Sequence, residues 1–240
     1  MCTVSWIHEP AGYQLFCNRD EKRIRGIAAP PRLAVRDGVQ FLAPVDADFG
    51  GTWIATNEFG LSLCLLNGVP GPSSRSRGLL VQDLISLPSI EALVDRVRTL
   101  DLSPFAPFAL AGVEPQNPGA VVEWNGARAA FSFPNESHFM LTSSSFDSGR
   151  VREKRREVYS KLTSLGCTPE LLADFHKSHG GTPSAYSICM HRPDAETVSF
   201  SWIRVSSDGI EFTYYDQAPC RRSQATKVRL PQSAARGDAG

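Results

Sequence analysis

A cysteine stands second in the chain, directly behind Met1 and at the start of an apolar stretch over residues 2–7. Removal of Met1 would leave a thiol and a free α-amine on the same residue. A cysteine thiol has a reference pKa of about 8.5 and an α-amine one of about 7.7 to 8.0, so the amine can take the thiol proton during attack on a carbonyl. Cys2 is therefore a candidate nucleophile that carries its own base. The alternative is a buried cysteine acting as a small hydrophobic residue.

The apolar pattern around Cys2 predicts strands and helices in alternating blocks. Strands are predicted at 4–7, 13–18, 52–56, 61–67, 108–113, 120–124, 127–133, 138–142, 187–191, 197–205 and 210–215. Helices are predicted at 78–87, 89–100, 150–165 and 168–176, with Ser89 and Thr168 as N-caps. The run 61–66 is apolar nearly throughout, which is typical of a strand covered on both faces.

This order of elements favours a layered α+β fold. Sheets covered on both faces, beside segregated helix pairs, predict two antiparallel sheets between two helix layers, a four-layer αββα sandwich. The periodicity also fits an α+β fold with one large sheet. We expect a single domain over residues 1–222 and a flexible tail over 223–240, where Ser, Gln, Arg, Gly and Ala accumulate.

The composition narrows the choice of partners. The 25 Lys and Arg residues balance the 25 Asp and Glu residues, so no overall charge favours nucleic acid or an anionic membrane. No apolar run approaches the roughly 18 residues of a membrane span, and no secretory signal pattern is visible. We expect a cytoplasmic protein without stable membrane insertion, whose partner is a small-molecule acyl substrate or an apolar ligand.

The six cysteines and five histidines show no spacing typical of a metal centre. C-x-x-C pairs are absent, which argues against a zinc ribbon or a dense disulfide framework. We interpret His176 and His179 as a solvated helix end, and the basic run 150–156 as a solvated helix face. Dinucleotide and phosphate-loop motifs are absent too. We therefore expect reduced thiols, no metal and no cofactor.

Four short motifs give the chain a resemblance to a known family. They are Met1-Cys2 before a strand, Asn18-Arg19-Asp20-Glu21 at the end of the next, Gly50-Gly51-Thr52-Trp53, and Leu65-Leu66-Asn67. In these motifs the chain resembles the NRDE family, also called transport and Golgi organisation proteins, from residue 1 to about 220. That family is similar to N-terminal nucleophile (Ntn) hydrolases of the penicillin acylase and bile-salt hydrolase group. The resemblance implies their αββα sandwich and a processed N-terminal cysteine.

The resemblance also implies roles for four residues. Cys2 would attack an amide or thioester carbonyl, Asp20 would orient its α-amine, and Arg19 would keep the thiolate charged. The Asn67 side-chain amide would donate to the oxyanion. Arg19 and Asp20 are adjacent here, whereas the acylase group separates its arginine and aspartate. Neighbours in a continuing strand point to opposite faces, so both reach Cys2 only if the strand ends or bends. A charged turn, and a turn at Asn67, are the alternatives.

Two functions follow from these observations. The first is hydrolysis of a carbon–nitrogen amide or thioester bond of a small acyl substrate by the N-terminal cysteine. The alternative is a non-enzymatic protein on the same fold that binds or traffics haem or an acyl lipid. Cys2 separates the two, because a hydrolase needs its free amine and thiol, whereas a carrier binds its ligand without them.

Overall fold

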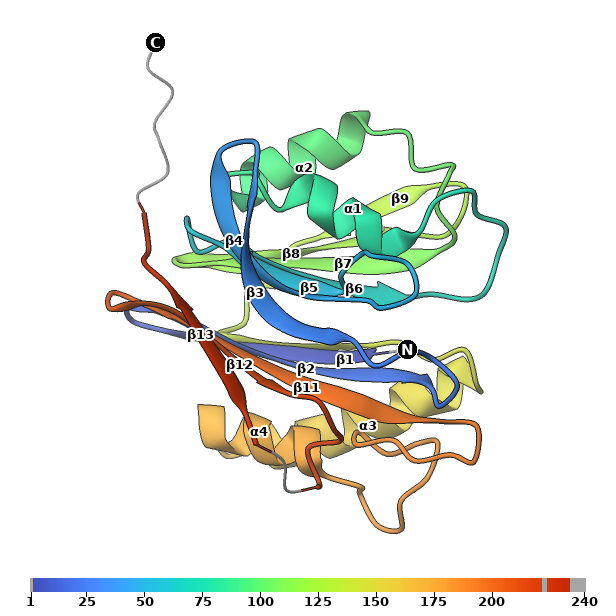
Figure 1. The fold of residues 1–240 in the computed structure, drawn as a ribbon. Coiled ribbons are helices and arrows are strands. Elements are labelled where there is room, and N and C mark those ends of the chain that lie inside the picture. Colours follow the sequence, from blue (N-terminus) through green and yellow to red (C-terminus); the bar gives the residue numbers. More distant parts are fainter. Residues whose placement is uncertain (1, 222–223, 234–240) are drawn as a thin grey trace.

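The computed structural model describes residues 2–221 and 224–233, and it consists of two stacked β-sheets between two helix layers (Figure 1). The six-stranded sheet has the order β10-β1-β2-β11-β12-β13, with β1 Cys2–Glu9, β2 Gly12–Lys22, β10 His138–Thr142, β11 Ala195–Ser206, β12 Gly209–Tyr215 and β13 Thr226–Leu230. The seven-stranded sheet runs in chain order, with β3 Ala29–Arg36, β4 Val39–Val45, β5 Ile54–Asn57, β6 Ser62–Asn67, β7 Phe108–Glu114, β8 Asn117–Trp124 and β9 Ala129–Ser132.

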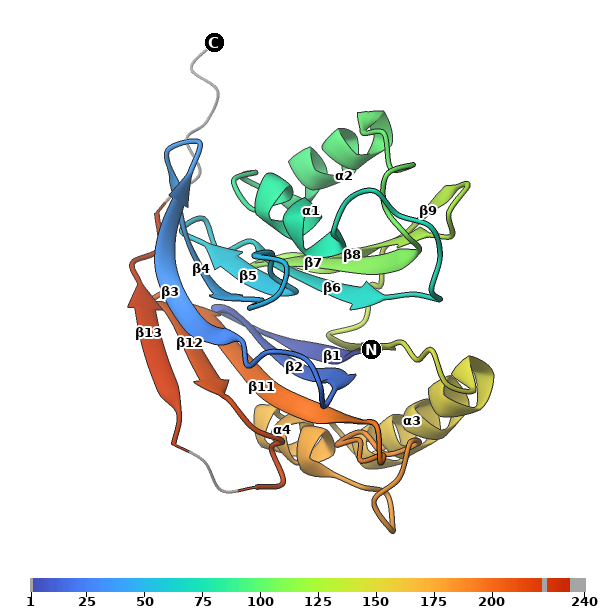
Figure 2. The ribbon, with the colours of Figure 1, turned by 45° about the vertical axis from the view of Figure 1, so that its right-hand side comes forward.

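The helices cover the outer faces of the two sheets, as Figure 2 shows. Helices α1 (Arg77–Leu84) and α2 (Ile90–Thr99) pack on the seven-stranded sheet, and α3 (Ser148–Thr163) and α4 (Pro169–Lys177) pack on the six-stranded sheet. Every neighbouring pair of strands is antiparallel. The predicted four-layer αββα sandwich is confirmed.

Alternation along the strands decides which side chains meet between the sheets. In β1, Val4 belongs to the core between the sheets, whereas Ile7 packs in the layer that contains α4. In β6, Cys64 joins the core between the sheets and Leu63 packs toward α1 and α2. Burial on both faces explains why the β6 sequence is apolar nearly throughout. Cys2 has the parity of Val4, so its side chain faces the space between the sheets.

Two predictions for the C-terminal part of the chain, from residue 187 onward, are wrong. The run 187–191, predicted as a strand, lies in the loop between α4 and β11, where only an isolated bridge joins His191 to Glu196. Its apolar residues Ile188, Cys189 and Met190 are all buried instead of alternating. Part of the expected flexible tail forms β13, whose Leu230 is buried in the core between the sheets. Residues 222–223 and 234–240 lie outside the described residues.

The sequence pattern also missed β3 and β4, whereas it placed the starts of α2 and α4 correctly. β3 is an edge strand that begins Ala29-Pro30-Pro31 and exposes most of its side chains, so it lacks an apolar alternation. Ser89 and Thr168 cap α2 and α4, each accepting a hydrogen bond at 3.2 Å from the backbone N–H three residues later.

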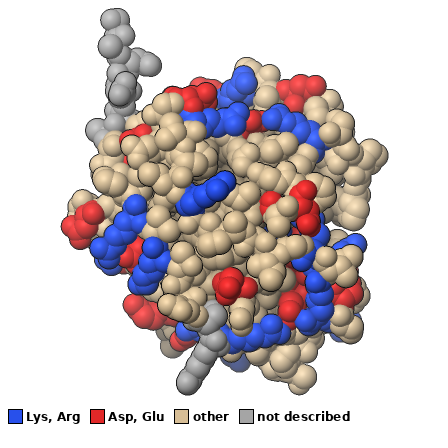
Figure 3. All heavy atoms as spheres, in the orientation of Figure 1, with Lys and Arg blue, Asp and Glu red and all other residues tan. Residues whose placement is uncertain are grey.

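Charged side chains of both signs are interspersed over the face of the molecule in Figure 3, in keeping with the zero formal charge of the chain. Among the described residues, no helix is both long and apolar enough to cross a membrane.

His176 is buried between α4 and the six-stranded sheet, which corrects its interpretation as part of a solvated helix end. Its Nε2 atom lies 2.9 Å from the Ser5 hydroxyl oxygen, and its ring packs against Phe16 and Phe200. Burial, together with the charge of Arg155, lowers the pKa of His176 to about 3. The imidazole is therefore neutral in the folded protein at neutral pH.

This shift predicts a loss of stability in mild acid. The pKa of His176 is lower in the folded chain than its usual value of about 6.5, so the neutral ring contributes stability above about pH 6.5, and this is lost as the pH falls toward 3. Urea titrations should show the free energy of unfolding declining over this window, and His176→Gln should flatten the decline. The half-buried His138→Gln is the control. An equal decline in wild type and His176→Gln would contradict the assignment.

Candidate functional site

A cavity of about 410 Å³ opens at the start of β1 and is lined by residues from the ends of β2 and β6 and from the start of α1. All four residues singled out from the sequence, Cys2, Arg19, Asp20 and Asn67, contribute to its lining. They come from three strands and from both sheets. The fold thus brings together four side chains that are up to 65 positions apart in the chain.

Cys2 lies directly opposite Arg19 in the antiparallel pairing of β1 with β2, and only 4% of its surface is exposed. A hydrogen bond with Cys17 and burial raise the pKa of the Cys2 thiol well above its ordinary value. The thiol is therefore protonated at rest. This direction is opposite to the expectation that Arg19 keeps a thiolate charged, and it means that attack by Cys2 requires a base.

Arg19 is held by Trp53 and Asp46, and it also lies 3.7 Å from the Glu21 carboxylate. Its guanidinium lies 4.3 Å above the centre of the Trp53 ring and donates a hydrogen bond of 2.5 Å to Asp46. Arg19 is 5% exposed. Because the Asp46 carboxylate neutralises much of its charge at this distance, Arg19 presents N–H groups to the cavity more than a net positive field.

Asp20 points to the opposite face of β2, toward α3. Its carboxylate accepts a hydrogen bond of 2.7 Å from the Thr197 hydroxyl and pairs with Arg155 at 3.2 Å. The strand therefore continues through Arg19 and Asp20, and the two side chains diverge as the alternation predicts. Arg19 shares the face of Cys2. Asp20 still lines the cavity, and its charge is close enough to raise the pKa of the Cys2 thiol.

Arg155, like His176, is buried although its sequence pattern predicted a solvated position. It belongs to the basic run expected on a solvated helix face, but it is 1% exposed and donates hydrogen bonds to Thr3 and Thr142 as well as to Asp20. The signal was present in the spacing. Val151 and Val158 define the apolar stripe of α3, and position 155 falls between them on the same face.

The buried pair predicts a large effect on stability. Replacing Arg155 with Met would leave the Asp20 carboxylate buried without its cation, so the free energy of unfolding should fall by about 3–5 kcal/mol. Lys154→Met on the same helix removes only an exposed pair with Glu157 and should leave the free energy of unfolding nearly unchanged. Chemical denaturation of both variants measures the difference. Similar small losses in the two would show that the buried pair does not carry this stability.

Asn67 is the last residue of β6 and reaches the cavity from the seven-stranded sheet. It has the parity of Leu65, which packs toward the helix layer of that sheet and also lines the cavity. Among the described residues, the Asn67 side chain makes no hydrogen bond to another protein group, so its amide is available to a ligand.

The cavity wall also contains the start of α1, which the sequence did not single out. The backbone of Gly51 lies so close to that of Gly78 that a Cβ added at 51 would stand 2.6 Å from the carbonyl carbon of Gly78. This contact, with a hydrogen bond from Thr52 N–H to Gly78 oxygen, sets α1 against the Gly50-Gly51-Thr52-Trp53 motif. Both glycines are therefore needed for the close approach.

Arg77, at the first position of α1, lines the same cavity as Cys2. It donates a hydrogen bond of 2.8 Å to the carbonyl oxygen of Pro107, and within the described residues it has no carboxylate partner. Burial lowers its pKa, while the nearby Cys2 opposes that shift. Among the described residues, Arg77 is thus an arginine of the cavity that makes no direct ion pair, although the more distant Glu21 carboxylate also acts on it. The alternating Ser and Arg residues before a predicted helix were the signal for it.

Residues 1–170 match the model of the family described as Transport and Golgi organisation 2. The chain belongs to this family. Comparison with curated proteins gives no match for this family member.

Solved structures show that the fold of this Transport and Golgi organisation 2 family member is that of Ntn hydrolases. An N-acylethanolamine-hydrolyzing acid amidase ortholog from Caenorhabditis elegans is 16% identical with a TM-score of 0.61, over 84% of this chain and 92% of that one. A mutant conjugated bile acid hydrolase from Clostridium perfringens is 14% identical with a TM-score of 0.60, over 99% and 94%. Penicillin V acylase from Agrobacterium tumefaciens is 12% identical with a TM-score of 0.59, over 96% and 86%.

Proposed function

We propose that the protein is an N-terminal-cysteine hydrolase that cleaves the carbon–nitrogen bond of an amide, or a thioester bond, in a small acyl substrate. The observation that carries this proposal is the position of Cys2, which is at the first described residue of β1, at a cavity, opposite Arg19 and close to the charge of Asp20. The fold shared with acylases and amidases supports it. The cytoplasmic location expected from the sequence stays a prediction.

Removal of Met1 supplies the base that the protonated Cys2 thiol needs. The free α-amine of Cys2 accepts the thiol proton while the sulfur forms a bond to the substrate carbonyl carbon. The tetrahedral intermediate then expels the amine, which takes that proton, and leaves a thioester on Cys2. Water attacks this thioester, with the α-amine again accepting a proton, and releases the acid and the thiol. The raised pKa of the Cys2 thiol favours such base-assisted attack over a standing thiolate.

The other three residues support this sequence of steps in different ways. Asp20, fixed by Arg155 and Thr197, orients the α-amine through its negative charge. Arg19, fixed on Asp46, presents N–H donors on the face of Cys2. Asn67 offers its free amide to the carbonyl oxygen as it becomes negatively charged. A donor aimed at that oxygen lowers the barrier by about 3–4 kcal/mol.

The lining of the cavity favours a polar substrate over an apolar carrier ligand. Four arginines contribute to it, namely Arg19, Arg25, Arg75 and Arg77. The first three form ion pairs with carboxylates, whereas Arg77 makes no such direct pair with any described residue and feels only the more distant charge of Glu21. An acyl substrate with a carboxylate, such as an N-acyl amino acid, would therefore find a cation near the nucleophile. Haem or an acyl lipid would bury apolar surface against these charges, which weighs against the carrier alternative.

The state of the N-terminus gives the first test. Intact mass of the purified protein should show loss of Met1, and a brief exposure to an electrophilic thiol probe should label Cys2 ahead of the other five cysteines, as mapped by peptide mass. Cys2→Ala should lose this label, and Cys167→Ala should keep it. Retained Met1, or a Cys2 no more reactive than the half-buried Cys167, would argue against the hydrolase and for ligand carriage.

Turnover gives the second test, in a panel of amides and thioesters that includes N-acyl amino acids. Cys2→Ala should abolish hydrolysis, and Asn67→Ala should lower kcat by about 10²–10³-fold because an oxyanion donor is lost. The exposed Asn135→Ala is the matched control and should leave kcat unchanged. Full activity in Cys2→Ala would overturn the mechanism, whereas an unchanged kcat in Asn67→Ala alone would remove only the role of that amide.

A further inference from the structure

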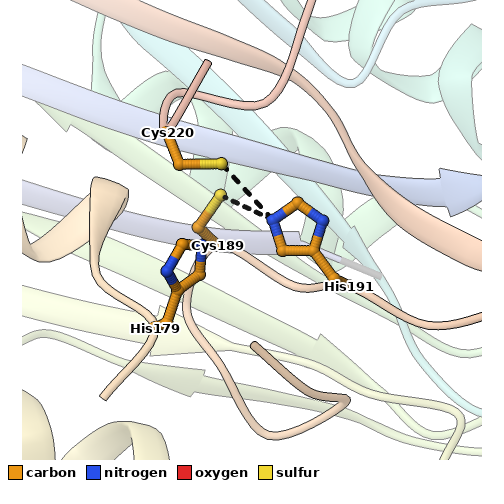
Figure 4. A group of neighbouring side chains, drawn as sticks. All are labelled: His179, Cys189, His191 and Cys220. Carbon is orange, nitrogen blue, oxygen red and sulfur yellow. Dashed lines mark hydrogen bonds between the residues drawn. The ribbon is translucent and has the colours of Figure 1, made fainter. Parts of the chain in front are cut away.

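Four side chains with metal-binding atoms meet on the far side of the six-stranded sheet from the cavity. They are His179, Cys189, His191 and Cys220, and their ligand atoms all lie within 4.8 Å of one another. Figure 4 shows the two sulfur atoms and the two imidazole rings directed toward a common point. Three come from the loop between α4 and β11, and Cys220 comes from the segment after β12. No part of the hydrolase proposal uses them.

The distances match those of a tetrahedral site. The Nε2 atom of His191 lies 3.6 Å from the sulfur of Cys189 and 3.4 Å from that of Cys220. In a zinc site with Zn–S bonds of about 2.3 Å and Zn–N bonds of about 2.0–2.1 Å, a nitrogen and a sulfur ligand stand about 3.6 Å apart. The rings of His179 and His191 have their centres 5.2 Å apart and do not stack face to face. The spacing therefore leaves room for one ion between the four atoms.

Two further observations indicate a ligand between these side chains. The Nε2 atom of His179 is buried and has no hydrogen-bond partner among the described residues, which is a costly state for a ring nitrogen. On the other side of the cluster, the Nδ1 atom of His191 lies 3.7 Å from the Glu196 carboxylate. A carboxylate behind a histidine fixes the ring so that its other nitrogen faces the metal, and such partners accompany most metal-bound histidines.

We propose that His179, Cys189, His191 and Cys220 bind one structural zinc ion. Two thiolates and two imidazoles in a tetrahedral arrangement form a typical Cys₂His₂ zinc set, and four protein ligands close the site to substrate. Each cysteine gives up its thiol proton when the metal binds. This replaces our expectation from sequence that the chain has no metal site. The ligands lie at 179, 189, 191 and 220, a spacing without the C-x-x-C and His-x₃₋₅-His pairs by which such sites are found.

The proposed ion would fix a loop that supports Asp20. Met190, between two of the ligands, donates its backbone N–H to the Thr197 hydroxyl at 2.8 Å, and that hydroxyl donates to Asp20 at 2.7 Å. The Met190 carbonyl in turn accepts from the Thr197 N–H at 2.9 Å. Zinc would therefore hold the loop, its contact with β11 and, one residue further, the carboxylate at the cavity. An effect of zinc on activity rests on the proposed function, whereas zinc binding itself does not depend on it.

The first experiment measures metal in the full-length protein, purified under reducing conditions and desalted. Elemental analysis should find close to one zinc per chain. Cys220→Ser should lose most of this zinc, Cys220→His should retain it because histidine is also a zinc ligand, and Cys167→Ser is the control that should keep the wild-type content. Glu196→Gln should weaken zinc binding by about 10–100-fold, as measured by competition with a chelator dye.

A second measurement uses only the wild-type chain, so it does not depend on how the variants fold. After removal of zinc, added cobalt(II) should give the visible bands of a tetrahedral centre and a thiolate charge-transfer band in the near ultraviolet. X-ray absorption at the zinc edge should give two sulfur ligands at about 2.3 Å and two nitrogen ligands at about 2.0 Å.

Three results would overturn the proposal. The reduced wild-type chain could bind neither zinc nor cobalt, or it could hold zinc through nitrogen and oxygen alone, which would mark an adventitious ion. A Cys189–Cys220 disulfide that persists in protein handled under reducing conditions, seen as a mass lower by two hydrogens, would account for the closeness of the sulfurs without a metal. If the chain binds zinc, the zinc proposal stands whether or not the protein hydrolyses a substrate. A failure of the zinc proposal is therefore distinct from a failure of the hydrolase proposal.

Discussion

The buried carboxylate of Asp20 is the constraint on which the arrangement of this protein depends. A charge without solvent is tolerated only when it is paired and hydrogen-bonded, and Asp20 obtains its partners from two elements, α3 and β11. Arg155 in turn binds Thr3 on β1 and Thr142 on β10. One ion pair therefore fixes four strands and a helix relative to one another, at the edge where Cys2 meets the cavity. Stability and the geometry of the candidate site have the same origin.

Sequence reasoning reached the layers of the fold because they follow from local patterns. The apolar run of β6, the stripes of the helices and the N-caps Ser89 and Thr168 each depend on a few neighbouring residues. The edge strand β3 was missed because its side chains are mostly exposed and carry no alternation. The loop at 187–191 was misread as a strand because consecutive burial, without alternation, has the same sequence signature.

The site was predicted unevenly, for a similar reason. Motifs brought Cys2, Arg19, Asp20 and Asn67 to one cavity in the prediction, and all four line it. The residues that pair with Arg19 and Asp20, namely Asp46 and Arg155, lie outside the motifs and could not be assigned from them. The pKa of the Cys2 thiol depends on Cys17 and on burial, which are tertiary features. Local sequence thus led to four residues of one cavity, whereas long-range contacts determine the pKa of the Cys2 thiol.

The contact between Gly51 and Gly78 explains how the cavity keeps its shape. Two backbones touch there because neither residue has a side chain, and α1 begins at this contact. Any larger residue at either position would push the first turn of α1 outward, together with Arg77, and would widen the opening of the cavity that Cys2 lines. The width of the cavity opening is therefore set by the lack of a side chain at two positions. A single substitution at Gly51 or Gly78, neither of which takes part in the chemistry, would be enough to change which substrates can enter.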